Sequence, residues 1–119
     1  MTTKLVDLQP QQGYVLRPEH YYSHEWFEAE QQNLFNKTWK FAGLETELSE
    51  VGDYLVVEVG YQPMLITRSE NGKLNALHNV CRHRGAKMLT SCGKNQGISC
   101  PYHAWRYDLE GNLTHVPQK

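Results

Sequence analysis

The sequence predicts a mainly β fold, an antiparallel sandwich or barrel preceded by an N-terminal helix. Three observations lead to this prediction. Short β-rich segments recur from residue 39 onward, at a spacing typical of antiparallel sheets. Turn-forming sequences such as Asn71-Gly72 separate several of these segments. Two loops that each carry one Cys and one His follow the middle segments, where hairpin tips are expected.

Residues 1–38 are expected to form an arm and a helix, separate from a domain of residues 39–119. Proline and glycine interrupt any regular period in the first 20 residues. Ser23 is a suitable N-cap for a helix that runs to about Lys37. The apolar side chains expected to pack from this helix are Trp26, Phe27, Leu34 and Phe35.

The β domain is expected to contain six strands. Gly52-Asp53 forms a turn before the second strand, Asn71-Gly72 joins the third to the fourth, and residues 110–112 join the last two. Residues 91–97 are expected to form a loop. The expected strands are residues 39–42, 54–59, 64–68, 74–79, 105–108 and 113–116.

Two short motifs carry the chemistry of this sequence. They are C-x-H at Cys81 and His83, and C-x2-H at Cys100 and His103. A [2Fe–2S] cluster in which two Cys hold one iron and two His hold the other needs this ligand set. Two ferric ions, two sulfides, two thiolates and two neutral imidazoles sum to zero charge, so this cluster accepts an electron more easily than a four-thiolate cluster. The motifs therefore predict one-electron transfer.

A structural zinc site is an alternative, because two Cys and two His also satisfy tetrahedral zinc. Zinc motifs usually place two Cys together and two His together, whereas each loop here mixes the two types. The third cysteine, Cys92, lies outside both motifs and is expected to be a free, dispensable thiol.

The residues around the motifs resemble the Rieske domain of ring-hydroxylating oxygenase large (alpha) subunits. Residues 79–86 read NVCRHRGA and residues 100–111 read CPYHAWRYDLEG. FNKTW at 35–39 and VGDY at 51–54 are similar to the family's upstream stretch, so the resemblance covers roughly residues 20–117. The family commonly has Gly where this chain has Ala104. Ala86 and Tyr102 stand where Rieske proteins of respiratory complexes carry two further, disulfide-bonded Cys.

This resemblance implies a Rieske-type fold with a [2Fe–2S] cluster held by Cys81, His83, Cys100 and His103. In the family, a reductase or ferredoxin reduces the cluster. The cluster then feeds a mononuclear non-haem Fe(II) in a second domain, which activates O₂ and hydroxylates an aromatic or related substrate as a dioxygenase or monooxygenase. That iron needs a 2-His-1-carboxylate triad, and we find no convincing triad in these 119 residues. We therefore expect the electron-input domain of a homo-oligomeric oxygenase, without a complete catalytic site.

A stand-alone Rieske ferredoxin is the alternative function, because such carriers are about this long. Residues 1–38 argue against it, since a simple carrier does not need them. A zinc-stabilised binding module is a third class of function.

Composition limits the partners and the compartment. The net charge of −1 argues against nucleic acid as a partner. The sequence has no apolar run of about 18 residues for a membrane span and no visible signal peptide, so a reducing cytoplasm is expected. Residues 81–106 contain five basic residues and no Asp or Glu, which indicates a docking rim for an acidic redox partner. Residues 104–105 offer no hydroxyl to a cluster sulfur, so we expect a potential in the lower half of the Rieske range.

Overall fold

The computed structural model describes residues 16–117, and the chain divides into two compact units, Met1–Lys40 and Phe41–Lys119. Within the first unit, the structure contains α1 (Glu19–Tyr22), α2 (His24–Asn33) and the short 3-10 helix η1 (Phe35–Lys37). The expectations for residues 1–15 lie outside the described residues.

The predicted N-terminal helix is present but shorter than expected. Ser23 caps α2 as predicted, because its Oγ accepts a hydrogen bond from the backbone N–H of Trp26 at 3.4 Å. The prediction that the helix continues to Lys37 was wrong, since α2 ends at Asn33. The Asn33 side chain donates to the carbonyl of Ala29, and such local bonds compete with continued helix.

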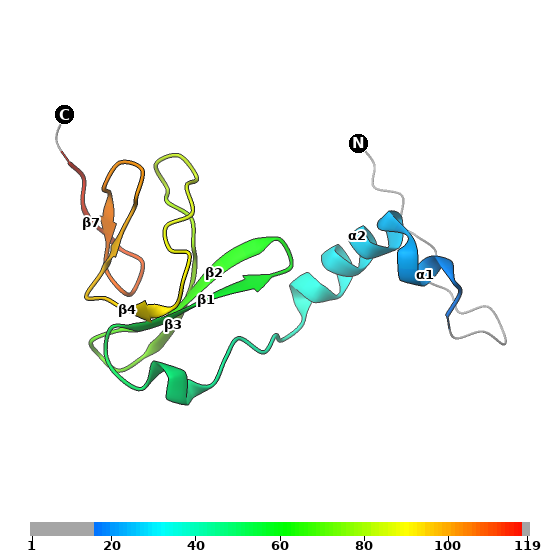
Figure 1. The fold of residues 1–119 in the computed structure, drawn as a ribbon, viewed down its shortest axis with the longest axis horizontal. Coiled ribbons are helices and arrows are strands. Elements are labelled where there is room, and N and C mark those ends of the chain that lie inside the picture. The colour runs from blue at the N-terminus through cyan, green and yellow to red at the C-terminus, as the bar shows by residue number, and fades with distance from the viewer. Residues whose placement is uncertain (1–15, 118–119) are drawn as a thin grey trace. The chain divides into compact units, whose positions relative to one another are not determined.

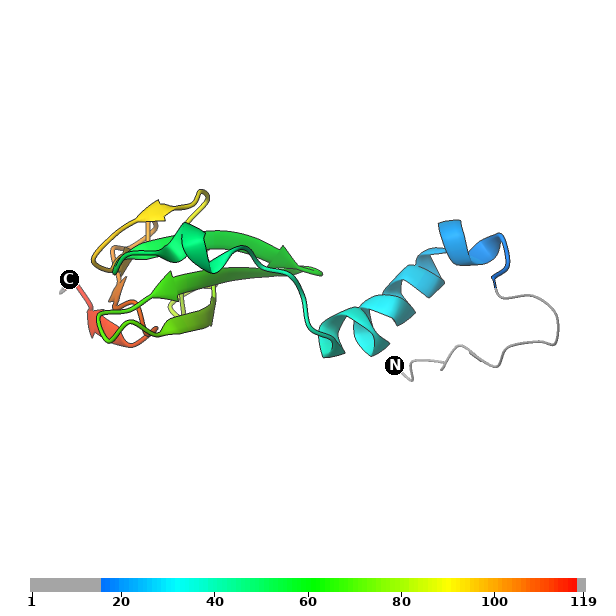
Figure 2. The same ribbon diagram turned by 90° about the horizontal axis from the view of Figure 1, so that it is seen from below.

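The second unit contains two antiparallel sheets (Figures 1 and 2). One sheet has the strand order β3-β2-β1-β4 and the other has the order β5-β6-β7. A 3-10 helix, η2, packs against β1. The elements are η2 (Glu45–Leu48), β1 (Asp53–Val59), β2 (Gln62–Arg68), β3 (Leu74–His78), β4 (Gly93–Lys94), β5 (Ile98–Ser99), β6 (Arg106–Tyr107) and β7 (Leu113–His115).

Two tight turns set the register of the larger sheet. Val59 pairs with Gln62, so Gly60 and Tyr61 form a two-residue hairpin turn between β1 and β2. Gly60 has a φ of 61°, the left-handed conformation that two-residue hairpins require. The β2–β3 hairpin turns at Asn71-Gly72 as predicted, with Gly72 at a φ of 76°.

Three expectations about strands were wrong. Residues 39–42 do not form a strand, and Trp39 and Phe41 are 102% and 83% exposed. No strand among residues 16–117 pairs with this segment, so its β-prone composition has no ladder of hydrogen bonds to join. Residues 91–97 include β4, which pairs with β1 at Tyr54, and β5 was not expected at all.

The hydrophobic core of the second unit joins the two sheets to the Cys/His loops. Its buried members are Leu65, Cys81, Met88, Ile98, Cys100 and Tyr107. Both cysteines of the predicted ligand set therefore belong to the core itself, so the site is anchored in the most rigid part of the unit.

The hairpin between β6 and β7 is pinned to the larger sheet. The buried Thr67 hydroxyl donates to the carbonyl of Leu109 at 2.5 Å, and the Asn75 amide donates to the same carbonyl at 3.4 Å. A Cβ at Gly111 would lie 3.0 Å from a methyl carbon of Leu77, so this close approach needs glycine. These contacts hold the smaller sheet, and with it the second loop, against β2 and β3.

No helix within residues 16–117 has the length and apolarity to cross a membrane.

Asp108 closes the turn between β6 and β7. Its carboxylate accepts hydrogen bonds from the backbone N–H groups of Glu110 and Asn112 and from the Asn112 amide, at 2.8–2.9 Å. Partial burial would raise the pKa of Asp108, but these bonds, from Asn112 above all, lower it below its usual value. The charged form is therefore the one that stabilises the turn.

We predict that Asp108→Ala lowers the free energy of unfolding by about 2 kcal/mol at neutral pH. Because the folded-state pKa is depressed, this stabilisation is present above the unfolded pKa and is lost as the pH falls through the folded pKa. Thermal unfolding of both proteins should show a constant difference above about pH 5 that narrows below about pH 4. The control is Glu110→Gln, which removes a carboxylate from the same turn but keeps these bonds. A pH-independent difference would contradict the prediction.

Candidate metal centre

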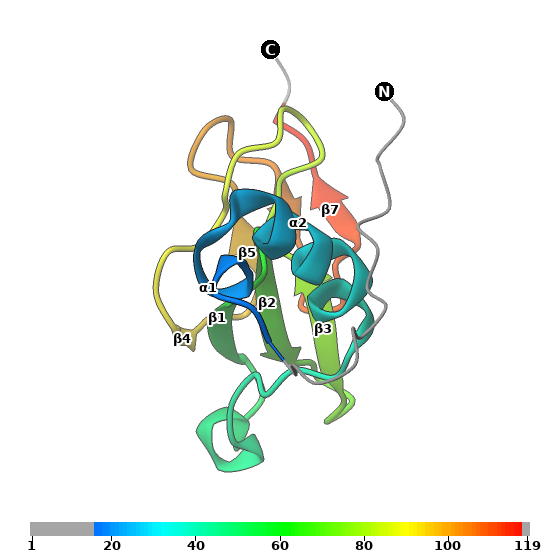
Figure 3. The same cartoon turned by 90° about the vertical axis from the view of Figure 1, so that its right-hand side faces the viewer.

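Two loops lie side by side at one end of the second unit (Figures 1 and 3). The first follows β3 and carries Cys81 and His83, and the second joins β5 to β6 and carries Cys100 and His103. The rings of His83 and His103 have centroids 4.8 Å apart, so the tips of the two loops are in contact. The structure thus brings together the two motifs that the sequence singles out.

Each loop contains the same pair of backbone hydrogen bonds, which we call its frame. In the first, the N–H of Cys81 donates to the carbonyl of Ala86, and the N–H of Gly85 donates back to the carbonyl of Cys81, at 2.8 and 2.9 Å. The second repeats this with Cys100, Trp105 and Ala104 at the same spacings and distances. Each frame fixes its cysteine at the base of the loop and projects its histidine from the turn.

The fifth residue of each frame has a left-handed backbone. Gly85 has a φ of 71° and Ala104 has a φ of 56°. Ala104 is the one non-glycine residue with a positive φ among residues 16–117. Alanine is less favourable at position 104 than the glycine common in the family, because a Cβ is strained in the left-handed backbone conformation.

The two cysteine thiols are buried beside one another. Cys81 is 1% exposed and Cys100 is 4% exposed. Burial raises the pKa of the Cys81 thiol, but hydrogen bonds from the Tyr107 hydroxyl, the backbone N–H groups of His83 and Arg84, and the Cys100 thiol lower it, and the net pKa lies below its usual value. The loop therefore favours a thiolate at Cys81, which is the form that binds metal.

The two imidazoles lie at the outer end of the site. His103 is exposed and contacts the Tyr102 ring, with centroids 3.9 Å apart. His83 is half-buried and stacks on the Trp105 indole, with centroids 4.7 Å apart and the planes 7° from parallel. Trp105 in turn packs against the core, so it holds the His83 ring in a defined orientation.

The grouping of these side chains fits a two-metal cluster better than one zinc ion. Thiol lies against thiol and imidazole against imidazole, which is the arrangement needed when each iron takes a like pair. Within residues 16–117, no three Cys, His, Asp or Glu side chains converge as ligands of a single ion.

Two buried residues that the sequence analysis did not identify support the site. The Tyr107 hydroxyl lies 3.4 Å from the Cys81 sulfur and accepts a hydrogen bond from the N–H of Arg82 at 3.1 Å. The Asn79 amide donates to the carbonyl of Leu89 and accepts from the N–H groups of Met88 and Leu89. Asn79 lies two residues before Cys81, so its position offered a signal, whereas the contact of Tyr107 with Cys81 spans 26 residues and offered none.

Cys92 lies outside both frames. It is exposed, and its sulfur accepts a hydrogen bond from the N–H of Val56 at 3.4 Å. This position is consistent with the expectation that Cys92 is not a ligand.

Comparison with known proteins shows the family to which the chain belongs. Residues 38–119 match the family described as "Rieske [2Fe-2S] domain". The chain is 37% identical over 113 residues to the glycine betaine monooxygenase oxygenase subunit of Chromohalobacter salexigens, covering 93% of this chain and 25% of that protein. It is 36% identical, again over 113 residues, to the anthranilate 1,2-dioxygenase large subunit of Acinetobacter baylyi, covering 93% and 24%.

A solved structure of a quaternary ammonium Rieske monooxygenase in complex with its substrate L-carnitine is also similar. The TM-score is 0.78 at 36% identity, over 82% of this chain and 28% of that one. The chain therefore spans about a quarter of the length of the relatives that it matches.

We predict that Ala104→Gly raises the free energy of unfolding by about 1 kcal/mol, because glycine adopts the left-handed backbone without a Cβ penalty. The reciprocal variant Gly85→Ala should lower it by a similar amount. A Cβ at Gly85 meets no atom within 4 Å, so the loss of unfolding free energy in Gly85→Ala measures the backbone strain without a steric clash. Chemical denaturation of both variants measures the effect, and a destabilised Ala104→Gly protein would contradict the prediction.

Proposed function

Because the chain belongs to the Rieske [2Fe–2S] domain family, we propose that Cys81 and Cys100 bind one iron of the cluster and that His83 and His103 bind the other. The observation that carries this assignment is the pairing of like with like. The two buried thiols lie together, and the two imidazole rings lie together at the exposed end of the same two loops.

The cluster supplies reversible one-electron chemistry when it is bound. The residues of the chain prepare its environment. The Tyr107 hydroxyl and the N–H groups of His83 and Arg84 donate to the Cys81 sulfur, which stabilises the negative charge gained on reduction. Burial of both cysteines excludes water from the sulfur end, while the exposed His103 leaves the imidazole end accessible.

We propose that the chain is the electron-input domain of a Rieske oxygenase large subunit. Its similarity to two such subunits extends over 113 of its residues and so includes most of the segment before residue 38. A stand-alone ferredoxin would not need that segment. The mononuclear iron and the substrate pocket would lie in the larger part of the protein, as would most contacts of a homo-oligomer.

The relatives do not agree on a substrate class. Two are named for quaternary ammonium compounds, glycine betaine and L-carnitine, and one for anthranilate, an aromatic acid. The aromatic substrate expected from the sequence is therefore one of two classes that fit. A reductase, or a ferredoxin reduced by it, is the proposed electron donor.

We predict that the purified protein contains two irons and two sulfides per chain and gives, once reduced, the low-average-g EPR signal of mixed N and S ligation. Cys81→Ala and His103→Ala should each lose the cluster, because in each variant one of the two irons keeps a single protein ligand. Cys92→Ser is the matched control and should keep full iron and sulfide content. One equivalent of zinc without iron would refute the ligand assignment.

We predict that Tyr107→Phe lowers the reduction potential by about 40 mV, since the loss of a hydrogen bond that strengthens on reduction amounts to about 1 kcal/mol for one electron. Protein-film voltammetry measures the change. Tyr102→Phe is the control, because this exposed tyrosine lies in the second loop and contacts His103 through its ring. Equal shifts in both variants would show that the Tyr107 hydroxyl has no special effect.

A further inference from the structure

The two loops of the site differ at the residue that closes each frame. In the first loop the carbonyl of Ala86 accepts from the N–H of Cys81, and in the second the carbonyl of Trp105 accepts from the N–H of Cys100. Both closing residues also pack against the hydrophobic core. The methyl group of alanine ends within its own loop, whereas an indole is long enough to reach the neighbouring loop.

The Trp105 side chain crosses from the second loop to the first. Its indole lies face to face with the His83 imidazole, with ring centroids 4.7 Å apart and the planes 7° from parallel. Paired aromatic rings attract one another beyond the effect of the area that they bury. His83 is thus held on one face by a residue of the other loop.

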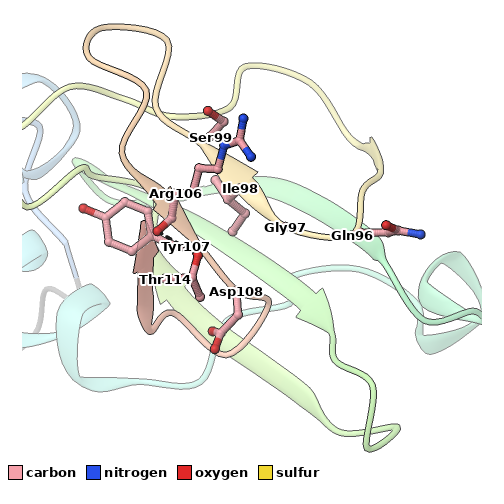
Figure 4. A pocket seen from close by; sticks show the side chains of 8 residues that line it. All are labelled: Gln96, Gly97, Ile98, Ser99, Arg106, Tyr107, Asp108 and Thr114. Atoms are coloured by element: carbon pink, nitrogen blue, oxygen red, sulfur yellow. Dashed lines mark hydrogen bonds between the residues drawn. The ribbon is translucent and has the colours of Figure 1, made fainter. Parts of the chain in front are cut away.

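The position of Trp105 is fixed by the smaller sheet. β5 and β6 pair in antiparallel register, and the hydrogen bond from the N–H of Cys100 to the Trp105 carbonyl continues this ladder by one residue. Figure 4 shows Arg106 and Tyr107 projecting from β6 in different directions, as alternation along a strand requires. Trp105 packs against the core, as Tyr107 does. The ladder and the core together restrict movement of the indole.

The His103 imidazole has a different kind of support. Its ring contacts that of the preceding residue, Tyr102, with centroids 3.9 Å apart and an interplanar angle of 37°. Tyr102 is 59% exposed, so it can move together with His103. The edge contact between the two imidazoles is mutual and favours neither. The ring partner of His83 is therefore anchored in the core, and that of His103 is not.

The orientation of an imidazole ligand affects the metal that it binds. An imidazole bound through one nitrogen can still turn about the metal–nitrogen bond, within the limits of its own side chain. Contacts from residues outside the ligand set fix the ring plane and thereby tune the metal site. The two proposed imidazole ligands differ in these contacts.

We propose that Trp105 is a positioning residue of the site. From the second loop it fixes the ring plane of His83 in the first, and this makes the two imidazole ligands unequal. The ring of His83 is held in one orientation, whereas the ring of His103 samples a wider range. Trp105 supplies no ligand atom and acts through His83. This inference rests on the proposed function, because it takes both histidines as ligands of one iron.

The test is pulsed EPR of the reduced holoprotein labelled with ¹⁵N-histidine, which resolves the nitrogen couplings of the two imidazoles. The parent protein should show one sharp coupling, from the fixed ring, and one that is spread over a range of values. Trp105→Leu keeps an apolar side chain but removes the ring, and should broaden the sharp coupling until it resembles the other. Trp105→Phe keeps a ring that can stack, and should restore the sharp coupling.

Two further variants make the test specific. Trp105→Met is a second variant without a ring, whose flexible side chain fills irregular space, and it should behave as Trp105→Leu does. Tyr102→Leu is the matched control, because it removes the ring that contacts His103. It should leave the sharp coupling as it is in the parent protein. Iron release to a chelator should be about fivefold faster in both ringless Trp105 variants, through the loss of stacking, and close to the parent rate in Trp105→Phe.

The nitrogen couplings separate failure of this inference from failure of the proposed function. Equally sharp couplings in the parent protein would overturn the inference alone. Equal broadening of both couplings in Trp105→Leu would also overturn it, because a general loss of packing affects both imidazoles. A parent protein whose reduced cluster couples to fewer than two imidazoles would instead refute the proposed ligand set.

Discussion

The reciprocal pair of backbone hydrogen bonds at each cysteine is the constraint on which the site depends. In both loops the cysteine N–H donates to a carbonyl five residues on, and its carbonyl accepts from the N–H four residues on. This closed frame places each cysteine in the core and each histidine outside it, although the histidine comes two residues after Cys81 and three after Cys100. The frame also imposes the left-handed residue, so the strain at Ala104 is a consequence of the same geometry.

The two cysteines proposed to bind the iron–sulfur cluster are part of the hydrophobic core. Cys81 and Cys100 pack in the hydrophobic core that joins Leu65 of the larger sheet to Ile98 of the smaller sheet. The hydrogen bond from Thr67 to the Leu109 carbonyl adds a polar connection between the same sheets. Because both cysteines of the proposed ligand set are anchored in this core, rotation of one sheet against the other would change the separation of the two loops. The packing therefore provides the rigid support that an electron-transfer site needs.

Local patterns predicted the parts of the fold that local chemistry determines. The cap at Ser23, the Asn71-Gly72 hairpin and the β1 strand, whose composition is strongly β-forming, were found where the sequence indicated. The errors concern pairing over distance. β4 and β5 are two residues long and exist because Tyr54 and Tyr107 supply partners, whereas residues 39–42 have β-forming composition but no strand partner within residues 16–117. The four proposed ligands could be selected from their spacing. The Tyr107 hydroxyl could not, because its contact with Cys81 spans 26 residues.

The chain is about equally similar to subunits of enzymes that act on two different classes of substrate. The chain is 37% identical to a glycine betaine monooxygenase subunit and 36% identical to an anthranilate dioxygenase subunit. The similar identities indicate that the substrate class has little influence on this part of the protein, where the residues of the two loops are constrained by the core and by the proposed cluster. Electron input is thus physically separable from substrate choice. Variation in the buried Cys81, Cys100 and Tyr107 would affect the proposed cluster directly, whatever the substrate.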